Sequence, residues 1–244
     1  MMDGRMVESN GFRWRGRDVS RLEALSDAVF GFAITLLVVS LEVPRTAAAL
    51  FEAMSGMVVF ALCFALLFFV WYNQYRFFRR YGLDDTATIV LNATLLFVIV
   101  FFVYPLRFVF GIVVEMLKGN RPWQETHDGV QVLSLSQWPA LMMVFGGGYV
   151  AVFLLFALMH VNAYSLRAAL ELSPLEAYDT LDNVRESLLN AGIGVVSVLL
   201  ALLGGEYGPL WAGLAYWTVG PLMYLHGWLS ARRRRRVEAR LAAG

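Results

Sequence analysis

Six apolar stretches, each long enough to cross a lipid bilayer, constrain the fold of this chain more than any other feature of its sequence. A membrane-spanning helix needs about 20 mostly apolar residues, whereas a strand of a membrane barrel has about ten residues of alternating hydrophobicity. The stretches here are continuous, so we expect helices. They cover about Leu22–Val43, Ala53–Tyr75, Thr86–Leu106 with a continuation past Arg107, Trp138–Leu166, Ser187–Gly205 and Tyr207–Ala231. The predicted fold class is an all-α membrane protein with six transmembrane helices and no soluble domain.

The composition agrees with lipid as the main solvent of the chain. Of its 244 residues, 59% are hydrophobic and 16% are charged, whereas soluble domains average about 45–50% and about 25%. The sequence contains no phosphate-binding loop, no Gly-x-Ser-x-Gly and no His-Glu-x-x-His. The single cysteine, Cys63, lies in an apolar run and is interpreted as a small buried residue. We therefore expect neither an enzyme nor a cofactor.

The distribution of basic residues predicts the orientation of the helices. Sixteen of the 20 lysines and arginines lie on one side of the predicted membrane, and four lie on the other. The sixteen are Arg5, Arg13, Arg15, Arg17, Arg21, Arg76, Arg79, Arg80, Arg167, Arg185, Arg232 to Arg236 and Arg240, and the four are Arg45, Arg107, Lys118 and Arg121. Because short basic loops remain in the cytoplasm, we expect a multi-pass protein of the cell membrane with both termini cytoplasmic.

These boundaries divide the chain into a cytoplasmic basic arm, 1–20, a transmembrane domain, 21–231, and a cytoplasmic basic tail, 232–244. The run Arg232 to Arg236 is interpreted as a topology anchor that also attracts anionic lipid, and nucleic acid is not an expected partner. In the inner connection, Ser173-Pro174-Leu175-Glu176 has the pattern of a capping box. A short helix is expected to begin there.

Histidines and glycines offer weaker signals. His127 lies in a loop, and His160 and His226 lie near helix ends. A haem or metal could bridge two such histidines, but nothing in their spacing indicates one, and we expect simple hydrogen bonding at the helix ends. We expect Gly146, Gly147 and Gly148 in the fourth helix to allow close helix packing.

The first helix contains ionisable residues, which are costly within a membrane and usually have a role. With 3.6 residues per turn, Phe32, Leu36 and Val39 form one apolar stripe, and Asp27 points about 140° away from Phe32. An all-apolar helix always contains some such stripe, so periodicity alone does not make it a pore.

The residue pattern of this helix is more specific. Arg21 is followed by Leu25-Ser26-Asp27, then by Thr35-Leu36 and Glu42-Val43-Pro44, which resembles the signature of the lysosomal-type potassium channel family, transmembrane protein 175, in its bacterial branch. Trp71, Asn92 and Pro105 further along the chain also fit the family. The chain departs from the signature at Leu25, where the family prefers Phe. It also departs from the family after Trp71, because Asn73, Gln74 and Tyr75 stand where the family has histidines.

The resemblance implies a potassium-preferring cation channel whose first helices line the pore. It assigns the apolar pore constriction to Phe32, Leu36 and Val39, although the family usually has Ile or Leu at the position of Phe32. The resemblance also implies that Thr35 contributes to potassium selectivity. Because one first helix cannot enclose a path, several copies must meet, and the family suggests a homotetramer.

Three residues of the motif, Arg21, Ser26 and Asp27, are expected to be structural. Candidate partners for the Asp27 carboxylate on other helices are Asn73, Gln74, Arg76 and Asn92. Glu42 either attracts cations at the outer mouth or is an ordinary solvated carboxylate at a helix end. A secondary transporter and a non-conducting membrane scaffold are the alternative functions, although the paired repeats typical of transporters are not evident.

Overall fold

The computed structural model describes residues 8, 11–16, 18–39, 46–47, 54, 56–120, 126–127, 130–131, 134 and 136–243. Its long helices are α1 (Arg21–Val39), α3 (Met57–Tyr81), α4 (Thr86–Leu117), α5 (Trp138–Ser165) and α6 (Pro174–Leu203), followed by α7 (Gly208–Ala215) and α8 (Val219–Ala243). Single turns of 3-10 helix lie at Gly205–Tyr207 and Tyr216–Thr218. Two short strands, β1 (Thr126–His127) and β2 (Val130–Gln131), form an antiparallel pair between α4 and α5. The predicted all-helical class is confirmed.

Five helices, α1, α3, α4, α5 and α6, are individually long and apolar enough to cross a membrane. The predicted sixth helix is divided, because α7 and α8 are separated by the 3-10 turn at Tyr216–Thr218. The helix α8 also continues beyond Ala231 through the arginine run to Ala243. The basic tail is therefore an extension of the last helix.

The capping box at Ser173 is present, since the Ser173 hydroxyl accepts from the Glu176 amide and the Glu176 carboxylate accepts from the Ser173 amide. The expectation of a separate short helix there is wrong. The segment continues without a break into the fifth apolar stretch as the 30-residue helix α6. No Pro or Gly lies between Glu176 and Ser187 to end the helix. As predicted, α4 continues past Arg107, and it contains Pro105.

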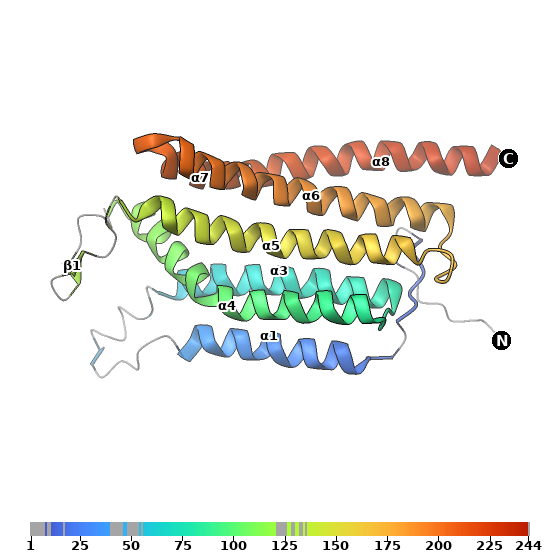
Figure 1. Cartoon of the computed structure of the whole chain (residues 1–244), viewed down its shortest axis with the longest axis horizontal. Helices are drawn as coiled ribbons and strands as arrows, with labels where there is room; N and C mark the ends of the chain where they lie inside the picture. Colours follow the sequence, from blue (N-terminus) through green and yellow to red (C-terminus); the bar gives the residue numbers. More distant parts are fainter. Residues whose placement is uncertain are drawn as a thin grey trace.

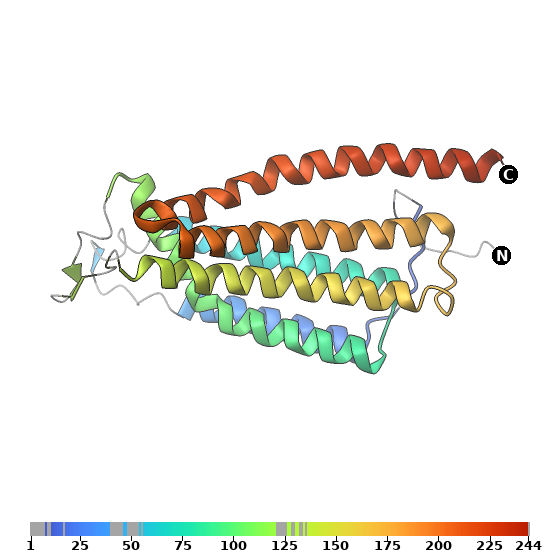
Figure 2. The ribbon, with the colours of Figure 1, turned by 45° about the horizontal axis from the view of Figure 1, so that its top comes forward.

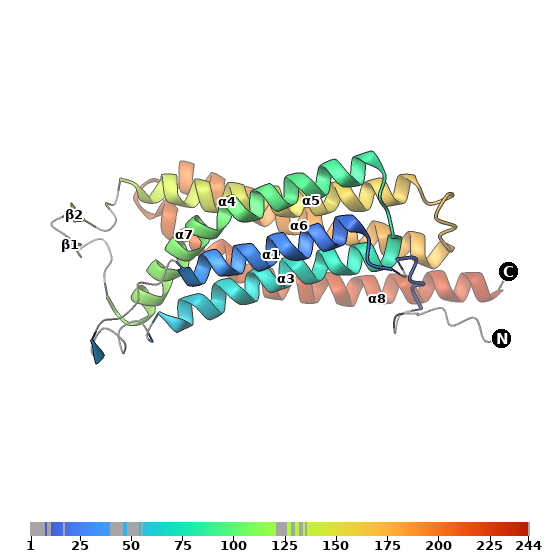
Figure 3. The same cartoon turned by 90° about the horizontal axis from the view of Figure 1, so that it is seen from below.

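The helices form an elongated bundle with the arm at 11–16 and the C-terminal end of α8 at the same end (Figure 1). In Figure 1 the helix α1 lies at one edge and α8 at the opposite edge, and in Figure 2 α8 is again at the upper edge, with α1 behind α4 on the opposite side. Figure 3 shows α1 beside α3, with α4 running obliquely alongside α1 and reaching past the left-hand ends of both helices. The core lies between α1, α3, α4 and α5, where Leu37, Leu95 and Met159 are among the fully buried side chains.

Glycines bring α5 close to its neighbours. A Cβ at Gly146 would lie 2.5 Å from Val198 Cγ2 of α6, and a Cβ at Gly148 would overlap the ring of Phe102 of α4. A Cβ at Gly147, which is exposed, would meet nothing within 4 Å. Close packing is thus confirmed at two of the three glycines. Cys63 is buried, as expected.

Candidate functional site

One face of α1 has no partner within the described part of the chain. Its side chains Phe32 and Val39 are 56% and 72% exposed, and Thr35 is exposed beside them. Leu36 is partly buried and packs against the core, so it lies at the edge of this face. The opposite face of α1 is buried against the bundle. The predicted stripe therefore lies on the uncovered side of α1, except for Leu36.

The Thr35 hydroxyl is oriented by its own helix. It donates to the Gly31 carbonyl at 2.9 Å. A hydroxyl oxygen that donates its hydrogen retains lone pairs that can accept or coordinate. Thr35 thus presents an oxygen on the otherwise apolar exposed face. Glu42 lies outside the described residues.

A buried polar network joins α1 to two other helices. The Ser26 hydroxyl donates to the Leu22 carbonyl at 2.8 Å and accepts from Asn92 Nδ2 at 3.0 Å. Asn92 Oδ1 accepts in turn from Gln74 Nε2. All three side chains are buried. Because a buried polar group without a partner is costly, this chain of hydrogen bonds holds α1, α4 and α3 at a fixed relative depth.

The Asp27 carboxylate is held by a residue that the sequence analysis did not choose as its partner. Trp71 Nε1 of α3 donates to Asp27 Oδ1 at 2.7 Å. The interpretation that Asp27 bonds to another helix is right, but its four candidate partners are wrong. Asn92 and Gln74 bond instead within the Ser26 network. An indole N–H was overlooked because Trp71 is otherwise an aromatic residue in an apolar run.

The start of α1 is also fixed, through residues that were missed. The Ser20 hydroxyl accepts from the Glu23 amide at 3.1 Å, and Glu23 Oε2 accepts from the Ser20 amide at 2.9 Å, which is a capping box. Glu23 Oε1 also forms an ion pair with Arg79 of α3 at 2.9 Å. The Ser-x-x-Glu spacing could have been read from the sequence. Arg21, the first residue of α1, is exposed.

The basic arm docks on the end of the bundle. Arg13 and Arg15 form ion pairs with the buried Glu176 of α6 at 3.0 and 2.9 Å. Phe12 is fully buried and meets Tyr81 edge-on, with ring centroids 5.7 Å apart. The backbone amides of Arg15 and Gly16 donate to the Arg79 carbonyl at 3.1 Å. The arm therefore joins α3 to α6.

Glu8 completes this contact. Its carboxylate accepts two hydrogen bonds from Arg80 at 2.9 and 2.6 Å and lies 3.7 Å from Arg76. Burial alone would raise the pKa of Glu8, but its hydrogen bonds with Arg80 and the charges of Arg80 and Arg76 hold that pKa below its ordinary value. The arm is thus tied down by a carboxylate that is ionised at neutral pH.

The histidines do not form a shared site in the described part of the chain. His160 is buried, with Nδ1 2.8 Å from the Phe156 carbonyl and its ring edge-on to Phe77. His226 of α8 lies 3.5 Å from Asp182 of α6. Among the described residues there is no group of three His, Cys, Asp or Glu side chains that could hold a metal ion. The side chain of His127 is outside the description.

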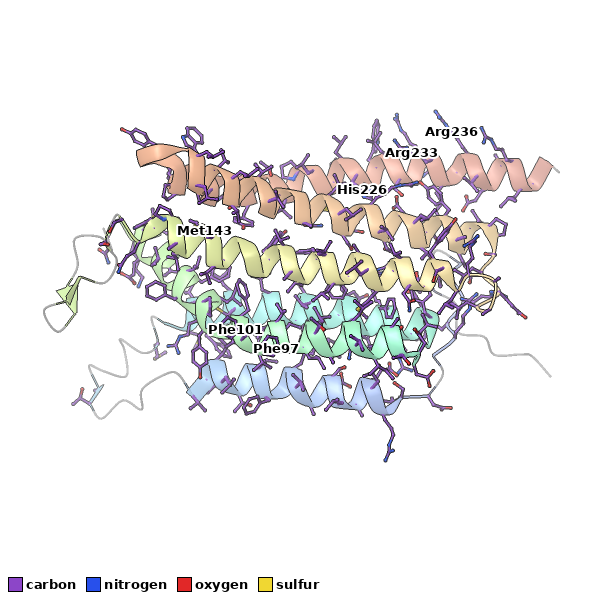
Figure 4. The ribbon with its side chains drawn as sticks, viewed as in Figure 1. Phe97, Phe101, Met143, His226, Arg233 and Arg236 are labelled. Atoms are coloured by element: carbon purple, nitrogen blue, oxygen red, sulfur yellow. The ribbon has the colours of Figure 1, made fainter. Side chains whose placement is uncertain are left out.

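The arginine run on α8 divides between inner and outer contacts. Arg234 forms an ion pair with Asp179 of α6 at 2.9 Å. Arg233 and Arg236 extend from α8 away from the bundle (Figure 4). Arg232 lies over the Trp228 ring, 3.4 Å from its centroid. Arg234 therefore contributes to the packing of α8 on α6, whereas Arg233 and Arg236 face away from the bundle.

These features define the class of the protein: a multi-pass α-helical membrane protein with a firmly anchored first helix whose other face is uncovered. Residues 21–102, which contain that helix, match the model of the family described as endosomal/lysosomal potassium channel TMEM175. A protein named potassium channel from Marivirga tractuosa is 35% identical over 93% of this chain and 93% of its own length. The chain belongs to the TMEM175 family.

Solved structures agree with this membership. The crystal structure of a threonine-to-alanine variant of the potassium channel MtTMEM175, in complex with a nanobody–MBP fusion protein, has a TM-score of 0.81 and 34% identity, covering 93% of this chain and 100% of that one. A lysosomal potassium-selective channel TMEM175 homolog from Chamaesiphon minutus shares the fold at a TM-score of 0.53 and 19% identity, with 86% and 96% covered. The family is one of ion channels, not enzymes.

Proposed function

We propose that this chain forms a potassium-preferring cation channel in which the α1 helices of several copies surround the pore. The observation that carries the proposal is the uncovered face of α1, which bears Phe32, Thr35 and Val39 within the segment matched to the channel family. An apolar face that large is stable in the chain only if lipid or another copy covers it. The potassium channels among the relatives favour another copy.

In this proposal Phe32, Leu36 and Val39 form the constriction, and Thr35 contributes to potassium preference. A narrow apolar ring blocks ions by excluding water and conducts when it widens enough to become wet. Glu42 concentrates cations at the outer mouth. The side chains of Arg232, Arg233, Arg235 and Arg236, at the cytoplasmic ends of four copies, attract anionic lipid.

Ion flux into liposomes that contain the pure protein tests the proposal. Replacing Phe32 or Leu36 with Asn is expected to raise flux, because a polar ring is wet more of the time. Thr35→Ala is expected to lower the preference for potassium over sodium. Val38→Asn is the matched control, because Val38 is exposed on α1 but outside the stripe.

Three results would distinguish the alternatives. Fast flux that needs no second ion indicates a channel, and slow flux coupled to another ion indicates a transporter. The absence of flux indicates a scaffold. If the Phe32, Leu36 and Thr35 variants all match the wild type in flux and selectivity, α1 does not line the pore.

A further inference from the structure

A polar cleft lies between α3 and α6, with α5 beneath it. Its walls include Asn73 and Arg76 of α3, Asn183 and Glu186 of α6, and His160 of α5. The space inside the cleft, its open mouth included, is about 460 Å³. The helix α3 ends and α6 begins at the end of the bundle that holds the arm at 11–16 and the C-terminal end of α8 (Figure 1). The cleft therefore lies toward that end of the molecule and outside the α1 face.

The polar cleft adjoins an apolar groove. Phe69 of α3 and Phe153 of α5 line both spaces. Beyond them the groove continues between α3, α4 and α5 along Leu66, Val70 and Phe102 and is lined almost entirely by apolar side chains. Polarity thus falls steadily along one face of α3, from Arg76 through Asn73 and Phe69 to Leu66.

The length of this gradient matches one leaflet of a membrane. Ten residues separate Leu66 from Arg76, which is about 15 Å along a helix that rises 1.5 Å per residue. The hydrocarbon core of a bilayer is about 30 Å thick. The cleft and the groove together therefore have about the depth of one leaflet, from the headgroup level to near the bilayer centre.

The two arginines of the cleft differ in what they bind. Arg80 is 4% exposed and donates two hydrogen bonds to Glu8. Arg76 is 36% exposed and reaches Glu8 only at 3.7 Å. A guanidinium has five N–H donors, and this long contact leaves most of those of Arg76 for another acceptor. Two carboxylates oppose an anion at this position: Glu186, exposed on the α6 wall, and Glu8, 3.7 Å from Arg76.

We propose that the cleft binds one glycerophospholipid, with its phosphate at Arg76 and one acyl chain along the apolar groove. The phosphate matches the geometry of a guanidinium, which binds it with two parallel hydrogen bonds. The acyl chain replaces water or a void against Phe69, Val70 and Phe102. This site is separate from the exposed arginines of α8, and its existence does not depend on ion conduction.

Native mass spectrometry of the full-length protein in detergent tests the site by titration with phosphatidylglycerol. Two partial ligands accompany it: dioleoylglycerol, which lacks the phosphate, and glycerol 3-phosphate, which lacks the tails. We expect phosphatidylglycerol to bind more tightly than either. Arg76→Ala should weaken binding by about tenfold, the loss that follows from removing a charge-assisted hydrogen-bond partner. The difference between the wild type and this variant separates the cleft from lipid at α8.

Two further variants test the groove for the acyl chain and the negative charge on the wall of the cleft. Val70→Trp fills the groove and should also weaken binding of phosphatidylglycerol, while Glu186→Gln should bind it at least as tightly as the wild type. Thermal unfolding without added lipid identifies any variant that is simply misfolded, and Arg76→Lys, which retains the charge, should bind more tightly than Arg76→Ala. Wild-type affinity in Arg76→Ala, or equal binding of dioleoylglycerol, would overturn the proposal.

Discussion

A single hydrogen bond between Trp71 and Asp27 decides how the most conspicuous carboxylate of α1 is accommodated. The donor is a neutral indole rather than a cation, and Asp27 is exposed in the single chain. A buried ion pair would lose about 3–5 kcal/mol when broken. A hydrogen bond to an exposed charged group is worth less, about 1–2 kcal/mol. The interaction is therefore a positioning contact of moderate strength.

We expect Asp27→Ala and Trp71→Phe to lower thermal stability by similar amounts, each equivalent to about 1–2 kcal/mol, because each removes one partner of the same bond. Trp71→Phe retains an aromatic ring between Phe68 and Tyr75. The double variant should lose little more than either single one. Unfolding in detergent, followed by intrinsic fluorescence and by light scattering, measures this.

The selectivity for potassium over sodium tests whether the role of Asp27 is structural. In liposomes, the surviving Asp27→Ala and Asp27→Asn channels should discriminate potassium from sodium as the wild type does. If Asp27→Asn has wild-type melting but altered selectivity, then Asp27 lines the ion path and the structural assignment is wrong.

Residue-level features were predictable only where the pattern is local. The Ser173 capping box follows from residues three apart, and Ser20 and Glu23 carry the same signal. Asp27 and Trp71 are 44 residues apart, and Arg13 and Glu176 are 163 apart. Nothing in one sequence indicates which of several polar residues at similar depth will meet. Tertiary packing decides such pairs.

At the scale of helices, the contact between α5 and α6 depends on small residues from both sides. A Cβ at Gly194 of α6 would lie 2.7 Å from Val150 Cγ2, and a Cβ at Gly146 of α5 would lie 2.5 Å from Val198 Cγ2. Helices in lipid associate by such close packing, because lipid tails supply no hydrophobic drive for association.

We therefore expect Gly146→Ala and Gly194→Ala to destabilise the protein by about 1–3 kcal/mol, the usual cost of overpacking. Gly147→Ala and Gly192→Ala are matched controls one and two residues away, where a Cβ would meet nothing within 4 Å. The controls should be neutral or slightly stabilising, because Ala favours helix. Equal melting temperatures within each pair would show that this packing is not tight.

Helix existence was predictable because lipid selects long apolar runs, and five of the six stretches correspond to single helices. The ends were less predictable. The start of α6 lies 13 residues before the predicted fifth stretch, since polar residues outside the membrane continue a helix as readily as apolar ones within it. The division of the sixth stretch at Tyr216–Thr218 has no Pro or Gly at the turn itself to announce it.

At the scale of the whole molecule, the arm at 11–16 and the C-terminal end of α8 lie at one end of the bundle, which an even number of membrane crossings requires (Figure 1). We expect cysteines placed at Asn120 and at Ala243 to react with an impermeant thiol reagent from opposite sides of the membrane. The background is low, because Cys63 is the single native cysteine and is buried. Labelling of both positions from the same side would contradict the six-crossing arrangement.

The number of copies is the second whole-molecule prediction. A homotetramer covers the α1 faces of its members with one another around a closed axis. Native mass measurement in mild detergent should give four chains. A monodisperse monomer that still conducts in liposomes would contradict a pore built from α1 of several copies.

During synthesis of the chain, Glu176 is added long after Arg13 and Arg15, the arm residues with which it forms ion pairs. Arg13 and Glu176 are 163 residues apart, with α1, α3, α4 and α5 between them. At a synthesis rate of about 5–20 residues per second, Glu176 is added on the order of ten to thirty seconds after Arg13 and Arg15. Before then they lack this carboxylate partner, and basic residues of this kind are what we expect to keep this end of the chain on the cytoplasmic side. The same two residues can thus act first as a signal for insertion and later as a clamp in the finished fold.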